Sequence, residues 1–575
     1  MVSPNLVKKG EDLRPIEITE DAKKLFQIIY SEQNKTEEKD DDTPKINVSA
    51  LVSRLAFFYE KVRNAVDYEE DHLLRKNAIS RILRRQIMIE GVLKESETEK
   101  IASHLLTELI RGSYLPNNKI PETKISEITL LLEKYIRLKD QAVTSFNASL
   151  NLKTDLNQAK DLLKEKNRLV RWILALAACE IEENLAPNRI KQVIVADLFS
   201  VLSKNLKLPA DLPYNQDLEI QIYLSIGRTF LKLDQDMLSF ILFKYYNNGW
   251  LDLAKEKVTA LEEEKIKKIA FGLKDLKILV AAQLNHPLVK QLDKIVRRYS
   301  LYFSILSETI EADPEKVYAE LQKGEKSFLA QIQKVCLEKY KKAKRRLWRA
   351  AVRSIIYIFL TKSIFVFLIE IPAIQWFGEP LNPTSLAINI CFPAALLFFI
   401  VSLTRTPKSN NTDKILAGIK EIAVLGQEKK QPIMLRRPLR RNWFKSGAFN
   451  FIYAVSFCFT ISFIIWALTK ISFNWVSIII FLFFLAFVSF FSVITTRGVK
   501  ELMVVERREN FLTFLFDLFY MPIILVGRWL SGEFSKLNVF VFLFDFIIEA
   551  PFQVLVEIVE DWTRYVRERR ENLES

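Results

Sequence analysis

The chain has 575 residues, of which 49% are apolar and 26% charged, and it carries a formal net charge of +14 at pH 7. Its 14 glycines and 3 histidines are few, which disfavours folds built on glycine-rich phosphate loops or histidine metal sites. The four cysteines, Cys179, Cys336, Cys391 and Cys458, lie far apart and match neither a disulfide framework nor a zinc site.

The N-terminal region, residues 1–47, contains the acidic stretch EQNKTEEKDDDTP at 32–44. Such a polar composition cannot bury enough apolar surface to fold alone, so we expect this region to be partly disordered. The opening residues MVSPNLVKKGEDLRPIE lack the apolar core of a signal peptide. We therefore expect the first membrane helix to act as the insertion signal.

Residues 48–338 show helical periodicity in one segment after another. In SALVSRLAFFYEKVRNAVDY, for example, Leu51, Leu55, Phe58 and Val62 share one face. No segment combines two-residue alternation with the turns of a hairpin, which argues against a sheet. The pattern predicts a large all-α domain, which we expect to be cytoplasmic and to bind a protein partner.

Long apolar runs dominate the chain after residue 350. Residues 339–353, KYKKAKRRLWRAAVR, form a collar of eight basic residues without an acid, followed by apolar hairpins at 354–404 and 447–496 around a basic loop at 405–446. Each apolar run has about 20 residues, the length that crosses a bilayer. The sequence thus predicts an all-α protein with four transmembrane helices behind the soluble domain.

The distribution of Lys and Arg predicts the orientation of these helices. By the positive-inside rule the N-terminal domain, the 405–446 loop and the chain after Arg497 lie in the cytoplasm. We expect an integral protein of a bacterial inner membrane with both termini cytoplasmic. Because the positive charge lies beside the membrane, we expect anionic lipid headgroups as partners and no nucleic acid. The candidate headgroup-binding residues are Lys341, Lys342, Lys344, Arg345, Arg346, Arg436, Arg437, Arg440 and Arg441.

Two charged residues fall within the first apolar run. Lys362 lies nine residues after Arg353, about 13 Å into the membrane. It either extends its stem back to the cytoplasm or has a buried acidic partner, and the sequence leaves both open. Glu370 precedes Pro372 and the aromatic boundary at Trp376. We therefore expect Glu370 to end the helix at the outer interface and to reach water.

Residues 510–566 are apolar but interrupted by charges, among them Asp517, Asp545 and Glu549. On a helix, 545–566 has an acidic face and an apolar face. Two arrangements fit: a third hairpin, giving six crossings with the acidic face toward Lys362, or an amphipathic pair along the cytoplasmic membrane surface. The sequence favours the surface pair or a re-entrant form of it. A charged tail, 567–575, follows.

Motifs of catalysis are missing: the sequence has no Walker lysine loop, G-x-G-x-x-G, H-E-x-x-H or G-x-S-x-G. The leading hypothesis is a non-enzymatic multi-pass protein, without a cofactor, that anchors a helical scaffold domain at the inner membrane face. The alternative is a transporter or channel with a polar path through Lys362, Asp517, Asp545 and Glu549. A lipid-modifying enzyme comes third, because it lacks a recognisable nucleophile or metal set.

Overall fold

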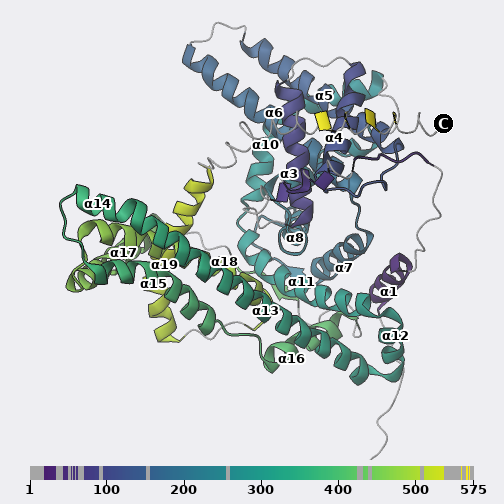
Figure 1. Ribbon diagram of the computed structural model, residues 1–575. Helices are drawn as coiled ribbons and strands as arrows, with labels where there is room; N and C mark the ends of the chain where they lie inside the picture. The colour runs from purple at the N-terminus through teal and green to yellow at the C-terminus, as the bar shows by residue number, and fades with distance from the viewer. Residues whose placement is uncertain are drawn as a thin grey trace, which may run out of the picture. The chain divides into compact units, whose positions relative to one another are not determined.

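The computed structural model describes most of the chain. The described residues are 19–33, 43–49, 53–54, 56–58, 60–61, 70–89, 95–150, 156–253, 260–423, 432–437, 443–505 and 510–536, with residues 558–559, 562, 565–566 and 569. The described part is almost entirely helical (Figure 1). The prediction of an all-α fold is confirmed.

The chain divides into two compact units. The helical unit comprises Tyr30–Ser300, Glu428–Arg436 and Val539–Ser575, and the bundle unit comprises Met1–Ile29, Leu301–Gln427 and Arg437–Asn538. Residues 301–338, which the sequence groups with the soluble domain, thus belong with the membrane-length helices.

The helical unit packs its helices around one apolar core. Its elements are α3 (Asp71–Arg84), η1 (Arg85–Ile89), α4 (Glu95–Arg111), α5 (Thr123–Leu150), α6 (Leu156–Leu185), α7 (Arg189–Asn205), α8 (Leu218–Ile226), η2 (Gly227–Leu231), α9 (Gln235–Tyr246), η3 (Trp250–Asp252) and α10 (Ala260–Leu284). Helix α6 packs against α3, α5 and α9, and α5 also packs against α4 and α10. The two-residue strands β1 (Leu206–Lys207) and β2 (Ile433–Met434) pair in parallel.

Local chemistry sets several helix starts in this unit. Asp234 caps α9 by accepting a hydrogen bond from the Met237 amide at 3.0 Å, which satisfies one of the orphan amides of the first turn. The same carboxylate accepts a hydrogen bond from the buried ammonium of Lys76 on α3 at 2.5 Å. One aspartate therefore both starts α9 and joins it to α3.

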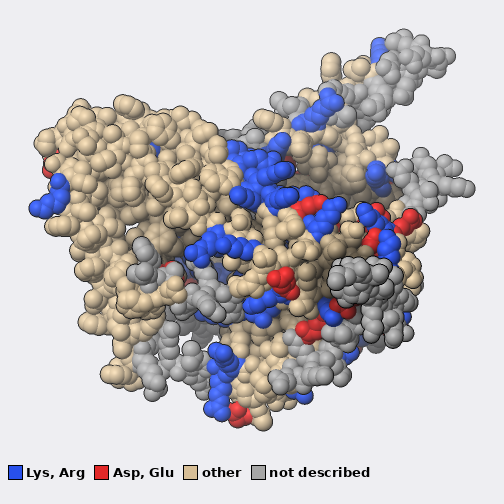
Figure 2. All heavy atoms as spheres, turned by 90° about the horizontal axis from the view of Figure 1, so that it is seen from below, with Lys and Arg blue, Asp and Glu red and all other residues tan. Residues whose placement is uncertain are grey.

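The bundle unit contains the membrane-length helices. After α1 (Glu20–Gln33) and α11 (Val289–Ala312), each of which runs across a unit boundary, its elements are α12 (Pro314–Lys323), α13 (Glu325–Phe365), η4 (Val366–Glu370), α14 (Ile371–Trp376), α15 (Pro383–Leu403), α16 (Ser409–Ala423), α17 (Trp443–Lys470), α18 (Trp475–Lys500) and α19 (Phe511–Lys536). Four stretches are long and apolar enough to cross a membrane: Glu325–Trp376, Pro383–Leu403, Gly447–Lys470 and Trp475–Lys500. Figure 2 shows a broad surface with few charged side chains at the left of the view. These four helices indicate a membrane protein.

Helix α13 passes without a break from the basic collar into the apolar part of the bundle (Figure 1). In the N-terminal half of α13, the side chain of Asn411 on α16 joins three segments of the chain. Its amide nitrogen donates to the hydroxyl of Tyr340 on α13 at 2.8 Å and to the carbonyl of Leu502 at 2.9 Å. Its amide oxygen accepts from the Val504 amide at 2.7 Å. These buried hydrogen bonds fix the N-terminal half of α13 to α16 and to the segment after α18.

Helix α19 packs along the membrane-length helices. Gly527 lies so close to α18 that an added Cβ would approach the Ala486 carbonyl oxygen to 2.0 Å. Ile523 joins the core formed with Leu468 and Leu485, and the Ser456 hydroxyl donates to the Leu518 carbonyl at 3.1 Å. Since Ser456 and Ala486 lie near the middle of their apolar runs, α19 occupies the depth of the spans.

The contacts of α19 fit a third hairpin or a re-entrant pair better than a pair lying flat on the membrane, and whether α19 crosses stays a prediction. A helix lying on the membrane would meet the spans only at their ends, whereas the contacts of α19 lie near their middle. The sequence pattern does not predict this packing of α19, because it scores apolar side chains and Gly527 has none. Gly527 matters because it lets the backbones of α18 and α19 approach closely. The second half of the predicted pair, which carries Asp545 and Glu549, lies outside the described residues.

We predict that the C-terminal end of α19 lies on the same side of the membrane as the 377–382 connection. In a chain without native cysteines, Lys536→Cys and Glu379→Cys are expected to react with a membrane-impermeant maleimide from the same side of intact cells. Ser409→Cys, on α16, is expected to react from the opposite side. Labelling of Lys536→Cys together with Ser409→Cys would show that α19 does not cross.

Candidate functional site

A π turn follows Lys362 and ends at Glu370, the two charged residues in the apolar run of the first membrane-length helix. In η4 (Val366–Glu370) the amide of Ile371 bonds to the carbonyl of Val366, five residues back. Pro372, which follows, has no amide hydrogen and cannot join a regular helical ladder. A π turn beside such a residue lets the helix continue, so Glu370 does not end it.

The π turn brings Lys362 and Glu370 onto one face. Two residues eight positions apart on a regular α-helix differ by roughly 80° around the axis. The extra residue of the π turn makes the spacing equivalent to about seven, which reduces the difference to roughly 20°. The ammonium nitrogen of Lys362 then lies 3.6 Å from Oε2 of Glu370, and both side chains are 0% exposed.

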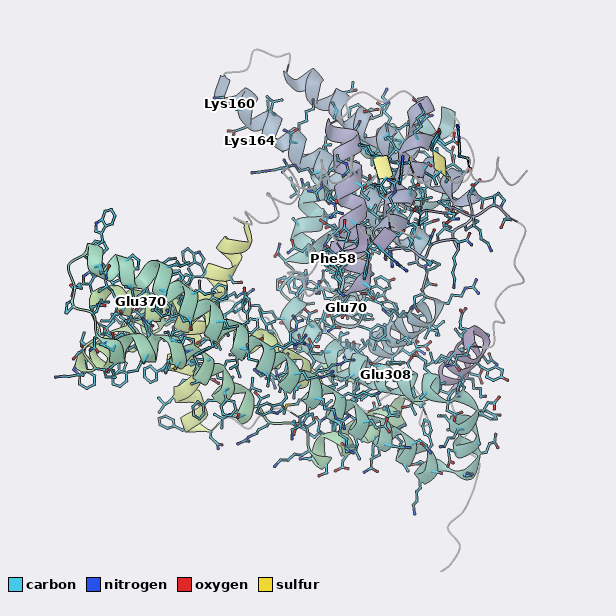
Figure 3. All side chains as sticks on the ribbon, in the orientation of Figure 1. Phe58, Glu70, Lys160, Lys164, Glu308 and Glu370 are labelled. Carbon is cyan, nitrogen blue, oxygen red and sulfur yellow. The ribbon has the colours of Figure 1, made fainter. Side chains whose placement is uncertain are left out.

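Two polar residues from neighbouring helices hold the carboxylate. Oε1 of Glu370 accepts a hydrogen bond from Asn389 Nδ2 on α15 at 2.6 Å and from Ser477 Oγ on α18 at 2.7 Å. The Asn389 amide also donates to the Ser477 carbonyl at 3.3 Å. The hydrogen bonds of Glu370 thus join α15 and α18 to the first membrane-length helix. Figure 3 shows Glu370 within the bundle.

Aromatic rings surround the ammonium of Lys362. Its nitrogen lies 3.9 Å from the ring centroid of Phe484 on α18 and 5.4 Å from that of Phe365. The negative face of an aromatic ring attracts a cation, most strongly where water is excluded. The site is therefore a sealed ion pair with a polar clamp on the acid and an aromatic clamp on the base.

The expectation that Glu370 reaches water is wrong. It rested on reading Pro372 as the end of the helix, whereas the helix continues to Trp376. Of the two alternatives for Lys362, the buried acidic partner holds and the extension to the cytoplasm does not. The partner is Glu370, eight residues further along the same helix.

Of the other candidate polar residues, the structure describes only Asp517. Asp517 is exposed on α19, and Asp545 and Glu549 lie outside the described residues. Asn389 and Ser477 complete the site, and the sequence analysis missed both. Asn389 carried a usable signal as the single amide inside an apolar run, while Ser477 could not be distinguished from the other serines of these helices.

The basic residues of the collar form an exposed stripe on α13. At 100° per residue, six of them fall within roughly 140° of the helix circumference. We define the basic stripe as these six residues: Lys341, Lys342, Arg345, Arg346, Arg349 and Arg353, all exposed. The opposite face buries Tyr340, Leu347 and Ala351.

Three predicted headgroup-binding residues lie beside or apart from the stripe. Lys344 is exposed but falls outside its arc, and Arg436 and Arg437 are exposed between β2 and α17. Arg440 and Arg441 are outside the described residues. All the candidates on α13 except Lys344 thus lie in the stripe, and the described candidates of the 405–446 loop, Arg436 and Arg437, are not on this helix.

A second buried ion pair lies in the helical unit. The Lys134 ammonium donates to Glu180 Oε1 at 2.7 Å, and the hydroxyl of Tyr135 donates to Oε2 at 2.6 Å. Trp250 Nε1 also donates to Oε2, at 2.9 Å. Burial lowers the pKa of Lys134, and the Glu180 carboxylate opposes this shift. The satisfied hydrogen bonds indicate that this cluster positions Trp250.

Comparison with protein-family models, with curated proteins and with solved structures finds no match to this chain. The function is therefore argued from its own residues.

We predict that breaking the membrane ion pair strongly destabilises the bundle. Glu370→Gln leaves the Lys362 ammonium buried without a counter-charge, which costs roughly 3–5 kcal/mol. Removing both charges in Lys362→Met/Glu370→Gln is expected to restore most of that stability. The measurement is the free energy of unfolding in mixed micelles titrated with dodecyl sulfate.

The exposed Asp517→Asn on α19 serves as the matched control and is expected to change the free energy by less than about 0.5 kcal/mol. A Glu370→Gln variant as stable as this control would contradict the role of the pair.

Proposed function

We propose that this chain is a non-enzymatic multi-pass membrane protein that holds a helical interaction domain at the cytoplasmic face. The observation that carries the proposal is the unbroken helix α13, which leads from the basic collar into the bundle. The helix is held at two places. Asn411 bonds to Tyr340 in its N-terminal half, and the ion pair with Glu370 holds Lys362 near its C-terminal end. Such a rod suits a rigid support.

The sealed ion pair supports anchoring over transport. A transport path needs polar groups that water or a substrate can reach, and both charges of the pair are fully buried. Oε1 of Glu370 accepts two hydrogen bonds, and the ammonium of Lys362 faces the ring of Phe484. Oε2 and the ammonium face one another at 3.6 Å without a hydrogen bond. The pair therefore resembles a lock between helices more than a relay.

Exposed apolar side chains in the helical unit support a protein partner. Phe271 and Ile278 on α10 are 65% and 64% exposed. Seven residues apart, they lie on one side of the helix, and Leu163 on α6 is also exposed. Apolar side chains grouped on a soluble surface are typical of interaction sites.

The scaffold proposal predicts a discrete partner at this apolar face. A photo-crosslinking residue at Phe271 or Ile278 of the full chain in cells is expected to give a defined protein adduct, and one at the exposed Lys191 on α7 is expected to give none. Equal adduct patterns at the three positions would contradict a specific face.

Transport is the second candidate, because ionisable residues within a membrane are functional by default. Reconstituted liposomes are expected to show no ion flux above that of empty liposomes. A flux that is lost in Lys362→Met/Glu370→Gln would overturn anchoring in favour of transport.

The basic stripe is proposed to bind anionic headgroups. Its six cations lie directly before the apolar part of α13, where each Lys or Arg near an anionic surface contributes about 1 kcal/mol. Phosphatidylglycerol is expected to raise the Tm of the detergent-solubilised protein, and phosphatidylcholine is not. In Lys342→Gln/Arg345→Gln/Arg346→Gln/Arg349→Gln this rise should disappear.

A variant that neutralises four lysines of the helical unit, Lys160, Lys164, Lys267 and Lys274, controls for net charge and should keep the rise. Loss of the rise in both variants would indicate a general charge effect and would contradict a site on the stripe.

A further inference from the structure

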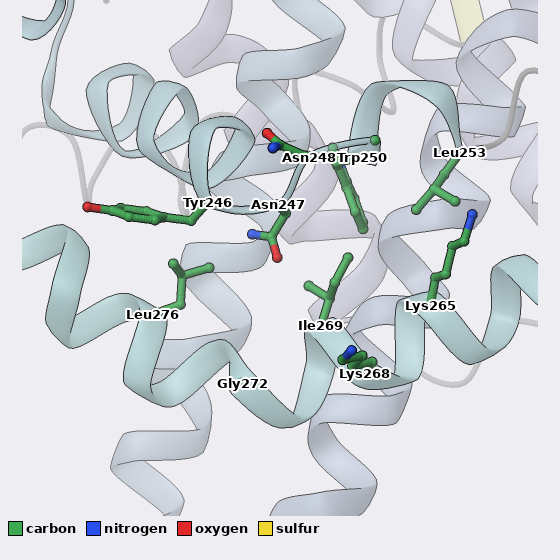
Figure 4. Close-up of a pocket in the computed structure, with 11 residues that line it drawn as sticks. Tyr246, Asn247, Asn248, Trp250, Leu253, Lys265, Lys268, Ile269, Gly272 and Leu276 are labelled. Atoms are coloured by element: carbon green, nitrogen blue, oxygen red, sulfur yellow. The ribbon is translucent and has the colours of Figure 1, made fainter. Parts of the chain in front are cut away.

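A pocket of about 490 Å³ opens in the helical unit between the end of α9 and the helix α10 (Figure 4). This volume is within the range of small-molecule sites. One wall is the connection Tyr246–Leu253, and the other is one face of α10, with Lys265, Lys268, Ile269, Gly272 and Leu276. None of these residues takes part in the functions proposed above.

The lining combines an apolar floor with a cationic and amide rim. Ile269 and Leu276 provide apolar surface from α10, and the ring of Tyr246 provides it from the opposite wall, which also contains the buried Trp250. In Figure 4 the amide of Asn247 lies between the side chains of Leu276 and Ile269. The charged side chains of the described lining are Lys265 and Lys268, both exposed. No described lining residue is acidic.

Two glycines keep the pocket open. An added Cβ at Gly272 would meet no atom within 4 Å, and the same is true of Gly249. Gly249 has a φ of +86°, a conformation that side chains disfavour, so the backbone turns there without a side chain above the pocket. The open space at these positions is thus built by residue choice.

The wall that carries Trp250 is rigid. Its indole is 1% exposed, and its nitrogen donates to Glu180 Oε2 at 2.9 Å and to the Tyr135 hydroxyl at 3.2 Å. The Lys134 ammonium lies 4.7 Å from its ring centroid and donates to its carbonyl at 3.3 Å. A buried charged network thus fixes one side of the pocket in advance, which reduces the entropy lost on binding.

We propose that this pocket binds a small organic anion with an apolar body. The two lysines select negative charge, because no acid in the described lining neutralises them. The amides of Asn247 and Asn248 offer hydrogen bonds to its polar atoms, and the floor formed by Tyr246, Ile269 and Leu276 takes the apolar part. An inorganic anion would leave this floor uncovered.

The test uses 4-(trifluoromethyl)benzenesulfonate as the probe and the full chain in detergent micelles. Fluorine line broadening, corrected for empty micelles, gives the Kd. Lys265→Ala/Lys268→Ala is expected to weaken binding at least about tenfold through the lost charged contacts. Gly272→Leu, which fills the open space and favours the helix, is expected to abolish it while the far-ultraviolet circular dichroism is unchanged.

The controls separate a built site from surface charge and from apolar partition. Lys267→Ala removes a neighbouring exposed lysine that does not line the pocket and should leave the Kd within about twofold. The neutral 4-(trifluoromethyl)benzyl alcohol should bind at least about tenfold more weakly than the sulfonate. Failure of the probe to bind, or binding that survives Gly272→Leu, would overturn the proposal.

Discussion

A charge cannot be left alone inside an apolar helix bundle, and the arrangement of the membrane-length helices follows from that constraint. Lys362 lies on α13, so the bundle must provide an acid within reach. Glu370 serves because the π turn before Pro372 rotates it onto the same face. The acid in turn draws Asn389 and Ser477 from α15 and α18. One helical irregularity therefore fixes the relative positions of three helices.

Helix α13 connects the membrane ion pair to the basic collar. Its apolar C-terminal half is held by the ion pair, and its N-terminal half by the hydrogen bond between Asn411 and Tyr340. The basic stripe lies between these two fixed points, opposite the buried face. A rigid helix with fixed ends and an exposed cationic side is suited to hold its neighbours at a lipid surface, which is the basis of the anchoring proposal.

The helical unit uses buried charge for a different purpose. Lys134 and Glu180 are joined by hydrogen bonds to Tyr135 and Trp250, and the result is a fixed wall and not a joint between spans. The pocket beside Trp250 depends on that wall and on the space left at Gly272. Both units thus place an ion pair within an apolar core. The pair of the helical unit belongs to a satisfied network, which favours one geometry.

The sequence alone determined the helical fold class and the four membrane-length helices, because these depend on the period and length of apolar runs. It also identified Lys362 as a charge within the first apolar run that either extends to the cytoplasm or has a buried acidic partner. Only the tertiary structure decided which residue that partner is, since the π turn changes the face of Glu370. The place of α19 was likewise decided by packing, through the backbone approach at Gly527. The first outcome depends on a local irregularity of the helix and the second on a contact between segments far apart in the chain. Hydrophobic periodicity records neither, because it shows only which face of a regular helix is apolar.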